Sequence, residues 1–168
     1  MGVTEELFRL GQAARRLNDG SDRLDRSLVQ IDRALARLML GFEYQLPRPI
    51  AESEHTDRSG KRVIEVCYLG YLRIPGFAES LVEGPEFHLA VRVIKVFETR
   101  LPDEPPGTLM PLIEAPRAVR HAAVDHLAVL VAGLAEQVDE MVTHIERRNE
   151  IASSLLCTLG APEDAAGD

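Results

Sequence analysis

Residues 116–159 read PRAVRHAAVDHLAVLVAGLAEQVDEMVTHIERRNEIASSLLCTL, and their pattern is the strongest structural signal in the chain. The apolar residues recur at alternating steps of three and four, the period of a helix with a coiled-coil-like seam. Pro116 suits the first turn of a helix and Gly160 the position just past its end, so we expect one long helix between them. The two seam positions hold Val124, Val131, Val138, Ile145, Ala152 and Leu159, and Leu127, Leu134, Met141, Arg148 and Leu155.

This seam is wider than a two-stranded coiled coil requires, because further apolar residues flank it. Only Arg148 is polar among the seam residues. A broad apolar stripe contacts more than one neighbouring helix. The flanking apolar residues are Ala123, Leu130, Val142 and Leu156.

A second heptad pattern opens the chain. Thr4 is a suitable N-cap with two glutamates after it, and Gly41 suits the C-terminal end of the same helix. Residues 18–21 have the composition of a turn, but the heptad keeps its phase across them. We therefore expect one helix, kinked or locally weak near Gly20, in preference to two. The seam positions hold Leu10, Leu17, Leu24, Ile31 and Leu38, and Leu7, Ala14, Ser21, Leu28 and Leu35.

The region between the two helices alternates as strands do. Residues 62–74 and 87–98 each carry apolar side chains at every second position, which predicts antiparallel strands. Lys95 interrupts the apolar face of the second stretch, so we expect a bulge or strand end there. The remaining segments are expected to be a short strand at 42–46, a polar loop at 51–60 and irregular connections at 75–85 and 100–111.

The expected fold class is thus α+β: a long helix, a two- to three-stranded antiparallel sheet and a long helix, with coiled-coil-like helix packing. A chain of 168 residues, 45% apolar and 27% charged, fits one globular domain. We place this domain at residues 1–160 and an acidic tail at 161–168.

Composition also bounds location and partners. The net charge of −8 argues against nucleic acid and against anionic membrane surfaces. The longest apolar run, Leu127–Ala135, is too short to cross a bilayer, and no secretory signal opens the chain. Cys67 and Cys157 form no disulfide framework pattern. We expect a soluble, cytoplasmic protein with no membrane partner and no cofactor.

The helix lengths predict self-association. At about 1.5 Å per residue the helices would be about 55 and 65 Å long, whereas a compact chain of this size has a radius of gyration of about 15 Å. Either the helices bend, or the molecule is elongated and exposes apolar seam. The seams could pair as an antiparallel hairpin within the chain or between chains, and we expect a homo-oligomer, with a dimer favoured, or a helical protein partner. The expected interface residues are Leu17, Leu24, Ile31, Val131, Leu134, Val138 and Ile145.

One turn holds the candidate ligand site. Arg117 and Arg120 stand in the first turns of the last helix, where the dipole disfavours cations. Two guanidinium groups beside free backbone N–H groups suit a carboxylate or phosphate, with Arg92 and Tyr71 of the strands as further ligands. The alternative is an ion pair with Glu114 or with acidic residues of the sheet or of a partner chain.

No pattern for metal or catalysis accompanies this turn. His121 with Asp125, and Glu140 with His144, are one helical turn apart, but neither pair has a third ligand nearby. No Gly-x-Ser-x-Gly element and no glycine-rich phosphate loop occurs. We therefore predict no catalytic residues and no metal ligands.

Three short stretches stand in order along the chain: Leu38–Glu43, then Leu69–Tyr71 with Leu89–Arg92, then Ala115–Arg117 with Arg120 and Ala123. This order resembles a loosely defined set of uncharacterised bacterial and phage-associated proteins. The resemblance implies a long helix, a short sheet and a helix opening with Pro-Arg, and no activity. It draws attention to Arg92, Arg117 and Arg120, and implies a regulatory partner of a toxin or phage component. The chain departs from the pattern where His88 stands in place of a tryptophan.

Two functions are compatible with these patterns. The first is a non-enzymatic interaction or assembly module that self-associates or binds a partner through its long amphipathic helices. The second is a small-anion-binding or enzyme domain with a site near the start of the last helix. A pocket with Arg92 and Tyr71 pointing into it would favour the second, and a salt-bridged surface would favour the first.

Overall fold

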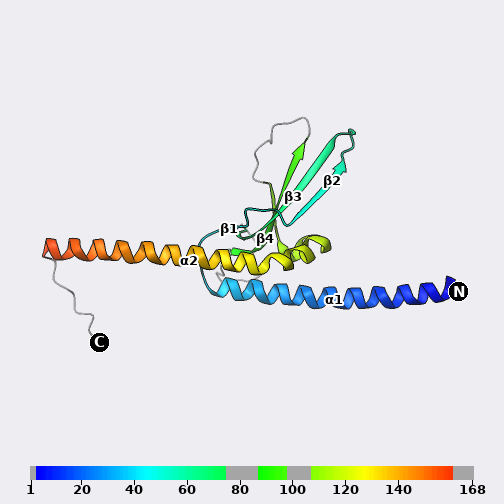
Figure 1. Ribbon diagram of the computed structural model, residues 1–168, viewed down its shortest axis with the longest axis horizontal. Coiled ribbons are helices and arrows are strands. Elements are labelled where there is room, and N and C mark those ends of the chain that lie inside the picture. The colour runs from blue at the N-terminus through cyan, green and yellow to red at the C-terminus, as the bar shows by residue number, and fades with distance from the viewer. Residues whose placement is uncertain (1–2, 75–86, 98–106, 161–168) are drawn as a thin grey trace. The chain divides into compact units, whose positions relative to one another are not determined.

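A computed structural model describes residues 3–74, 87–97 and 107–160 (Figure 1). The α+β class is confirmed, with two long helices and a five-stranded antiparallel sheet between them in sequence. The elements are α1 (Val3–Arg37), β1 (Tyr44–Gln45), β2 (Ala51–Thr56), β3 (Arg62–Arg73), β4 (Phe87–Phe97), β5 (Thr108–Pro111), the short 3-10 helix η1 (Leu112–Glu114) and α2 (Arg117–Leu159).

The chain divides into two compact units, Met1–Leu130 and Val131–Asp168. The first contains α1, the whole sheet and the opening turns of α2. The second contains the rest of α2, which ends at Leu159 before Gly160 at a φ of 63°. The single-domain prediction stays a prediction, and the predicted tail and the 75–85 connection lie outside the described residues.

Helix α1 runs without a break through Gly20. Gly20 is not among the glycines with a positive φ, so its backbone is ordinary helix, and a Cβ added there would meet nothing within 4 Å. The helix ends at Arg37, four residues before the predicted Gly41, because the Leu38 and Met39 amides turn back to Leu35 and Ala36 in a tighter turn. One helix is therefore correct for this segment.

The sheet has two strands more than the upper limit of the prediction. β1 and β2 pair in succession with the same edge of β3, and β3, β4 and β5 follow in order. β2 lies where a loop was predicted, and β5 lies inside the predicted irregular connection, so both predictions were wrong there. β2 is polar along nearly its whole length because it is an edge strand exposed on both faces, which removes the alternation that marks a half-buried strand.

No bulge occurs at Lys95. The pairing of β3 with β4 continues through the Glu65–Lys95 pair to Val63 and Phe97. The ammonium of Lys95 lies 3.0 Å from the Glu65 carboxylate across the two strands. The lysine thus completes a cross-strand ion pair on the exposed end of the sheet, and the predicted interruption was wrong.

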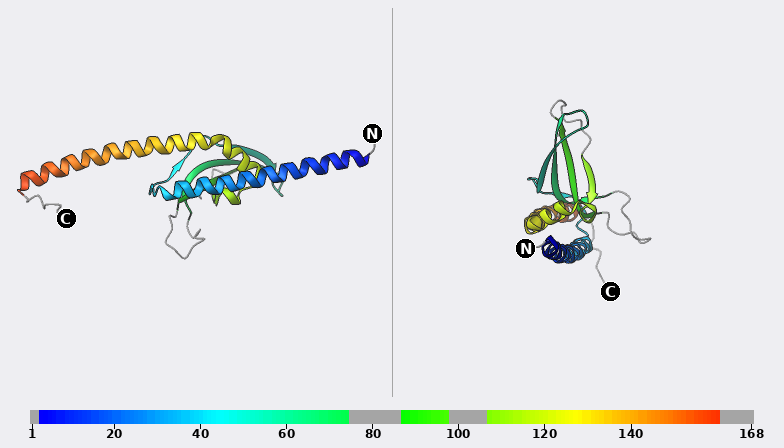
Figure 2. Two further views of the ribbon diagram at one scale, coloured as in Figure 1. Left: turned by 90° about the horizontal axis from the view of Figure 1, so that it is seen from below. Right: turned by 90° about the vertical axis from the view of Figure 1, so that its right-hand side faces the viewer.

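One part of the core lies where one face of the sheet meets the helices, and Leu72 and Ala90, which cluster with Ile74, are buried on the other face. Leu69, Tyr71 and Val91 are fully buried on the face that meets the helices, and Leu28 of α1 is 2% exposed. Asp32 of α1 ties the helix to β4, because its carboxylate accepts the backbone N–H of Leu89 at 2.6 Å and lies 3.0 Å from His88 Nδ1. Figure 2 shows α1 and the opening turns of α2 running along one side of the sheet.

Within the first unit, α1 and the start of α2 run parallel. Arg117 contacts Leu17 and Asn18, and His121 contacts Ser21, so residue numbers rise together on the two helices. In Figures 1 and 2, α1 and the opening turns of α2 run in the same direction. The antiparallel hairpin does not form here, because the sheet carries the chain back beside the middle of α1 before α2 begins.

Candidate functional site

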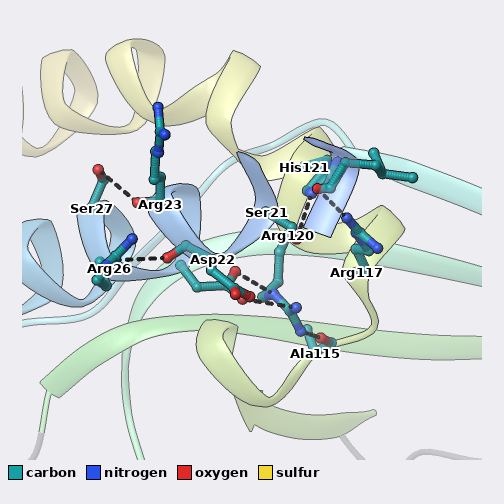
Figure 3. A network of polar contacts seen from close by, with 11 residues as sticks. Ser21, Asp22, Arg23, Arg26, Ser27, Ala115, Arg117, Arg120 and His121 are labelled. Atoms are coloured by element: carbon teal, nitrogen blue, oxygen red, sulfur yellow. Dashed lines mark hydrogen bonds and ion pairs between the residues drawn. The ribbon is translucent and has the colours of Figure 1, made fainter. Parts of the chain in front are cut away.

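Arg120 joins the two helices through a forked ion pair. Its Nε and Nη2 donate to the two carboxylate oxygens of Asp25 at 2.8 and 3.1 Å, and its Nη1 donates to the Ala115 carbonyl at 2.6 Å (Figure 3). Both side chains are part-buried, which makes such a two-pronged pair stronger than an exposed one. The Asp25 carboxylate offsets the unfavourable position of a cation near the start of α2.

Two further contacts join the same two helices. Arg117 donates to the Leu17 carbonyl at 2.6 Å and to Asn18 Oδ1 at 3.2 Å. His121 Nε2 and the hydroxyl of Ser21 share a hydrogen bond of 3.2 Å, and Ser21 is 6% exposed. We call these residues, Ser21, Asp25, Arg117, Arg120 and His121, the helix junction. Its guanidinium groups are engaged in protein contacts.

The four predicted anion ligands do not converge. Arg117 and Arg120 lie one turn apart on α2, but Arg92 pairs with Tyr68 whereas Tyr71 pairs with Leu89. Side chains alternate across a strand, so Arg92 and Tyr71 point to opposite faces of the sheet.

Tyr71 occupies the core and not a ligand pocket. Its hydroxyl donates to the Leu35 carbonyl at 3.4 Å, and burial, with the Asp32 charge as a smaller cause, raises the pKa of the phenol. The anion site stays a prediction, and any anion would have to displace the contacts of the helix junction.

Sequence reasoning missed Asp25 and Asp32, the two acidic side chains that hold α1 in place. A signal for them exists. They are seven residues apart and directly follow seam residues Leu24 and Ile31, so they lie on one flank of the seam. A charged residue that repeats beside a buried seam indicates a partner on the neighbouring element.

The predicted interface residues fall into three groups by exposure. Leu24, Ile31 and Val138 are half-buried, and Leu134 is 3% exposed. The exposed group has 44 to 58% of each residue accessible. It consists of Leu17, Val131 and Ile145.

The open part of the α2 seam lies in the second unit. Every residue from Asp139 to Gly160 is exposed. The large apolar residues exposed there are Met141, Val142, Ile145, Ile151, Leu155, Leu156 and Leu159.

Helix α1 has a corresponding open part. Every residue from Val3 to Gly20 is exposed, whereas Leu28, Leu35 and Ala36 farther along the helix are buried. The exposed large apolar residues of this part are Val3, Leu7, Phe8, Leu10 and Leu17.

Helix α2 is long and apolar enough to cross a membrane, by length and composition alone. It contains an 18-residue window of mean hydropathy 1.3, of which 28% is buried in the structure. It is the one such helix among the residues that the structure describes. Core helices of soluble proteins have the same length and hydropathy, so this property alone does not indicate a membrane span.

The two cysteines differ in surroundings. Cys67 is 8% exposed on β3, and burial, with the nearby Glu65 charge as a smaller cause, raises the pKa of its thiol. Cys157 is exposed on α2. Within the described ranges, no three His, Cys, Asp or Glu side chains gather into a group that can hold a metal ion.

No protein family, curated protein or solved structure matches the chain. The resemblance to bacterial and phage-associated proteins therefore stays a prediction.

Proposed function

We propose that the protein is a non-enzymatic assembly module that self-associates through the exposed apolar face of α2. The observation that carries this proposal is the run of half-exposed apolar residues in the second unit, among them Ile145 at 50% and Leu155 at 57%. They recur with the seam spacing and therefore lie along one side of the helix. An exposed stripe of this kind is typical of a protein interface.

The size of the hydrophobic effect supports a tight contact. Removing a half-exposed Leu, Ile or Val side chain from water is worth on the order of 1 kcal/mol. Several such residues from each copy offset the roughly 4–15 kcal/mol that association costs in lost freedom. Self-association at micromolar concentration is then the expected outcome.

The breadth of the face favours a bundle over a narrow two-stranded coil. Val142 and Leu156 flank one side of the seam and Ile151 the other, so neither flank carries the charge pairs of a two-stranded coil. The charged residues of this part lie at outward heptad positions, apart from Arg148. The outward charged residues are Asp139, Glu140, Glu146, Arg147 and Glu150.

The open part of α1 offers a second contact surface. Leu7, Leu10 and Leu17 keep the seam spacing and are 58 to 64% exposed. A helix from another copy can pack against this seam, as it can against the apolar face of α2. The helix junction holds the middle of α1 in place. The first half of α1 stays free to contact a helix of another copy.

The test is the solution mass of the full chain, measured by sedimentation equilibrium between 1 and 100 µM. We expect an oligomer for the unaltered protein. The double variant Ile145→Glu/Leu155→Glu should weaken association by at least about 100-fold, because charges would be buried in the contact.

The matched control places the same two charges elsewhere on the same helix. Thr143→Glu/Ser153→Glu adds two glutamates at exposed outward positions and should associate like the unaltered chain. A monomer at 100 µM, or equal weakening by both double variants, would contradict self-association. Binding to neutral lipid vesicles in place of oligomers would instead point to a bilayer as the partner.

A further inference from the structure

The open seam of α2 contains one charged residue and one small residue, four positions apart. Arg148 and Ala152 both lie in the exposed stretch from Asp139 to Gly160. The arginine is the one charged residue at a seam position of this stretch, and the alanine is the smallest seam residue there. The other seam residues of the stretch are Met141, Ile145, Leu155 and Leu159.

The position of Arg148 bears on how two copies of this helix can face each other. In a parallel pair in register, equal heptad positions meet, so Arg148 would lie against Arg148 of the second copy. Two like charges in an apolar contact are costly. In an antiparallel pair related by a twofold axis, a residue of one seam position meets a residue of the other. An axis beside Glu150 then sets each Arg148 opposite Ala152 of the second copy.

Ala152 suits this place because it is small. The stem of Arg148 can cross the alanine methyl group and bring its guanidinium group to water at the border of the contact. The charge therefore stays hydrated while the apolar part of the side chain is covered. The remaining layers of the same pairing are Met141 with Leu159 and Ile145 with Leu155.

The residues that flank the seam match about the same axis. On one flank, Val142 meets Leu156 of the second copy, and Asn149 meets Asn149. Apolar residues thus meet apolar residues, and an amide meets an amide that can share its hydrogen bonds. The other flank follows the same rule. Its pairs are Ile151 with Ile151 and His144 with Thr158.

A shift of one heptad in either direction loses this match. Asn149 then meets an apolar residue, Val142 or Leu156, and Arg148 no longer meets Ala152. An amide that is covered by an apolar side chain loses hydrogen bonds to water without replacement. The axis beside Glu150 also makes the overlap span residues 141–159, about 27 Å of helix, which is nearly the whole exposed stretch.

We propose that two copies of α2 pair antiparallel over residues 141–159, with the twofold axis beside Glu150. The inference rests on the proposed self-association, and it adds the orientation of the partner helix and the residues that meet. The open part of α1 stays available for a further contact, so this pair is compatible with a larger bundle.

The experiment measures distances between nitroxide labels on the two copies by double electron–electron resonance. Each chain carries one label, at one of four exposed outward positions a heptad apart. Cys157→Ser removes the natural site where another is used, and Cys67 should not react because it is buried and its thiol has a raised pKa. The four labelled sites are Glu136→Cys, Thr143→Cys, Glu150→Cys and the natural Cys157.

The antiparallel pair predicts a particular order of the four distances. Along the helix axis, the two labels are separated by about 42 Å at position 136, about 21 Å at positions 143 and 157, and about 0 Å at position 150. The distance should therefore be shortest at 150, equal at 143 and 157, and longest at 136.

Two results of this experiment would overturn the inference. Equal distances at all four sites would show a parallel pair, and a shortest distance midway between two labelled sites would show a shifted register. Either result leaves self-association intact, because the labelled chains are still oligomers. A chain that stays monomeric at 100 µM would instead contradict the proposed function itself.

A mixing experiment tests the axis without labels. Asn149→Asp and Asn149→Lys chains should each associate at least about tenfold more weakly than the unaltered chain, because like charges would meet beside the axis. Their equimolar mixture should regain the association, since opposite charges then meet. Sedimentation equilibrium measures both.

The matched control places the same two charges at an outward position. Thr143→Asp and Thr143→Lys chains should associate within about twofold of the unaltered chain, both alone and mixed. A mixture of the two Asn149 variants that associates no more tightly than each variant alone would contradict the twofold axis beside Glu150.

Discussion

The second half of the α1 seam and the last part of the α2 seam follow the same heptad rule but have opposite surroundings. Leu28 and Leu35 of α1 are 2 and 7% exposed, whereas Ile145 and Leu155 of α2 are 50 and 57% exposed. The period of the apolar residues is therefore no guide to what covers them. The sheet lies against the second half of α1, whereas the apolar residues of α2 from Met141 to Leu159 stay open.

The polar residues beside the two seams differ in the same way. Asp25 and Asp32 flank the seam of α1 and are bonded to Arg120, His88 and the Leu89 amide. Arg148 lies in the open seam and is itself exposed. Specific polar partners mark the covered region, since a part-buried charge without a partner would be costly.

The largest expected effect is on the free energy of unfolding, when a buried residue and its exposed neighbour are each replaced by alanine. Leu130→Ala removes a fully buried side chain and should lower the free energy of unfolding by about 2–5 kcal/mol. Val129 is 58% exposed, so Val129→Ala should change it by only about 0.5 kcal/mol. Urea unfolding of both variants measures the difference, and equal losses would show that the two residues are not distinguished by burial.

The next effect concerns the ion pair of the helix junction. Asp25→Asn keeps the shape but removes the charge that Arg120 contacts with two nitrogen atoms, and should cost about 1–3 kcal/mol of unfolding free energy. Asp22→Asn, at an exposed position one turn away, should cost less than about 0.5 kcal/mol. If the two variants unfold at the same temperature, the ion pair between Asp25 and Arg120 contributes little to the free energy of unfolding.

A smaller effect should appear in association and not in unfolding of the single chain. Ile145→Ala should weaken self-association by about tenfold, because it removes an interface side chain. Unlike Leu130→Ala, its effect on the urea midpoint should vanish as the protein is diluted below its dissociation constant. A concentration-independent loss would mean that Ile145 is covered within its own chain.

The smallest effect concerns the helix backbone. Gly20→Ala should raise the free energy of unfolding by about 0.5–1 kcal/mol, because the glycine lies in regular helix with open space around its Cβ position. Gly41→Ala should have the opposite sign, since Gly41 has a φ of 73°. Circular dichroism during heating compares the two, and destabilisation by Gly20→Ala would indicate a break in α1.

Much of the fold could be predicted from local patterns. The long helices follow from heptad spacing and from Pro116 and Gly160 near the ends of α2, and β3 and β4 follow from two-residue alternation. The edge strands β2 and β5 could not be found this way. Their side chains do not alternate, because their existence depends on hydrogen bonds to β3 and β4 and not on their own composition.

For the candidate site, the sequence by itself identified Arg117 and Arg120 as cations in an unfavourable position near a helix start. Only the tertiary structure supplied their partners, Asp25 and the Leu17 carbonyl, because these lie about a hundred residues earlier in the chain. Contacts between elements so far apart depend on how the sheet returns the chain to α1. Periodicity thus determined which residues share a face, and tertiary packing decided which of those faces are covered.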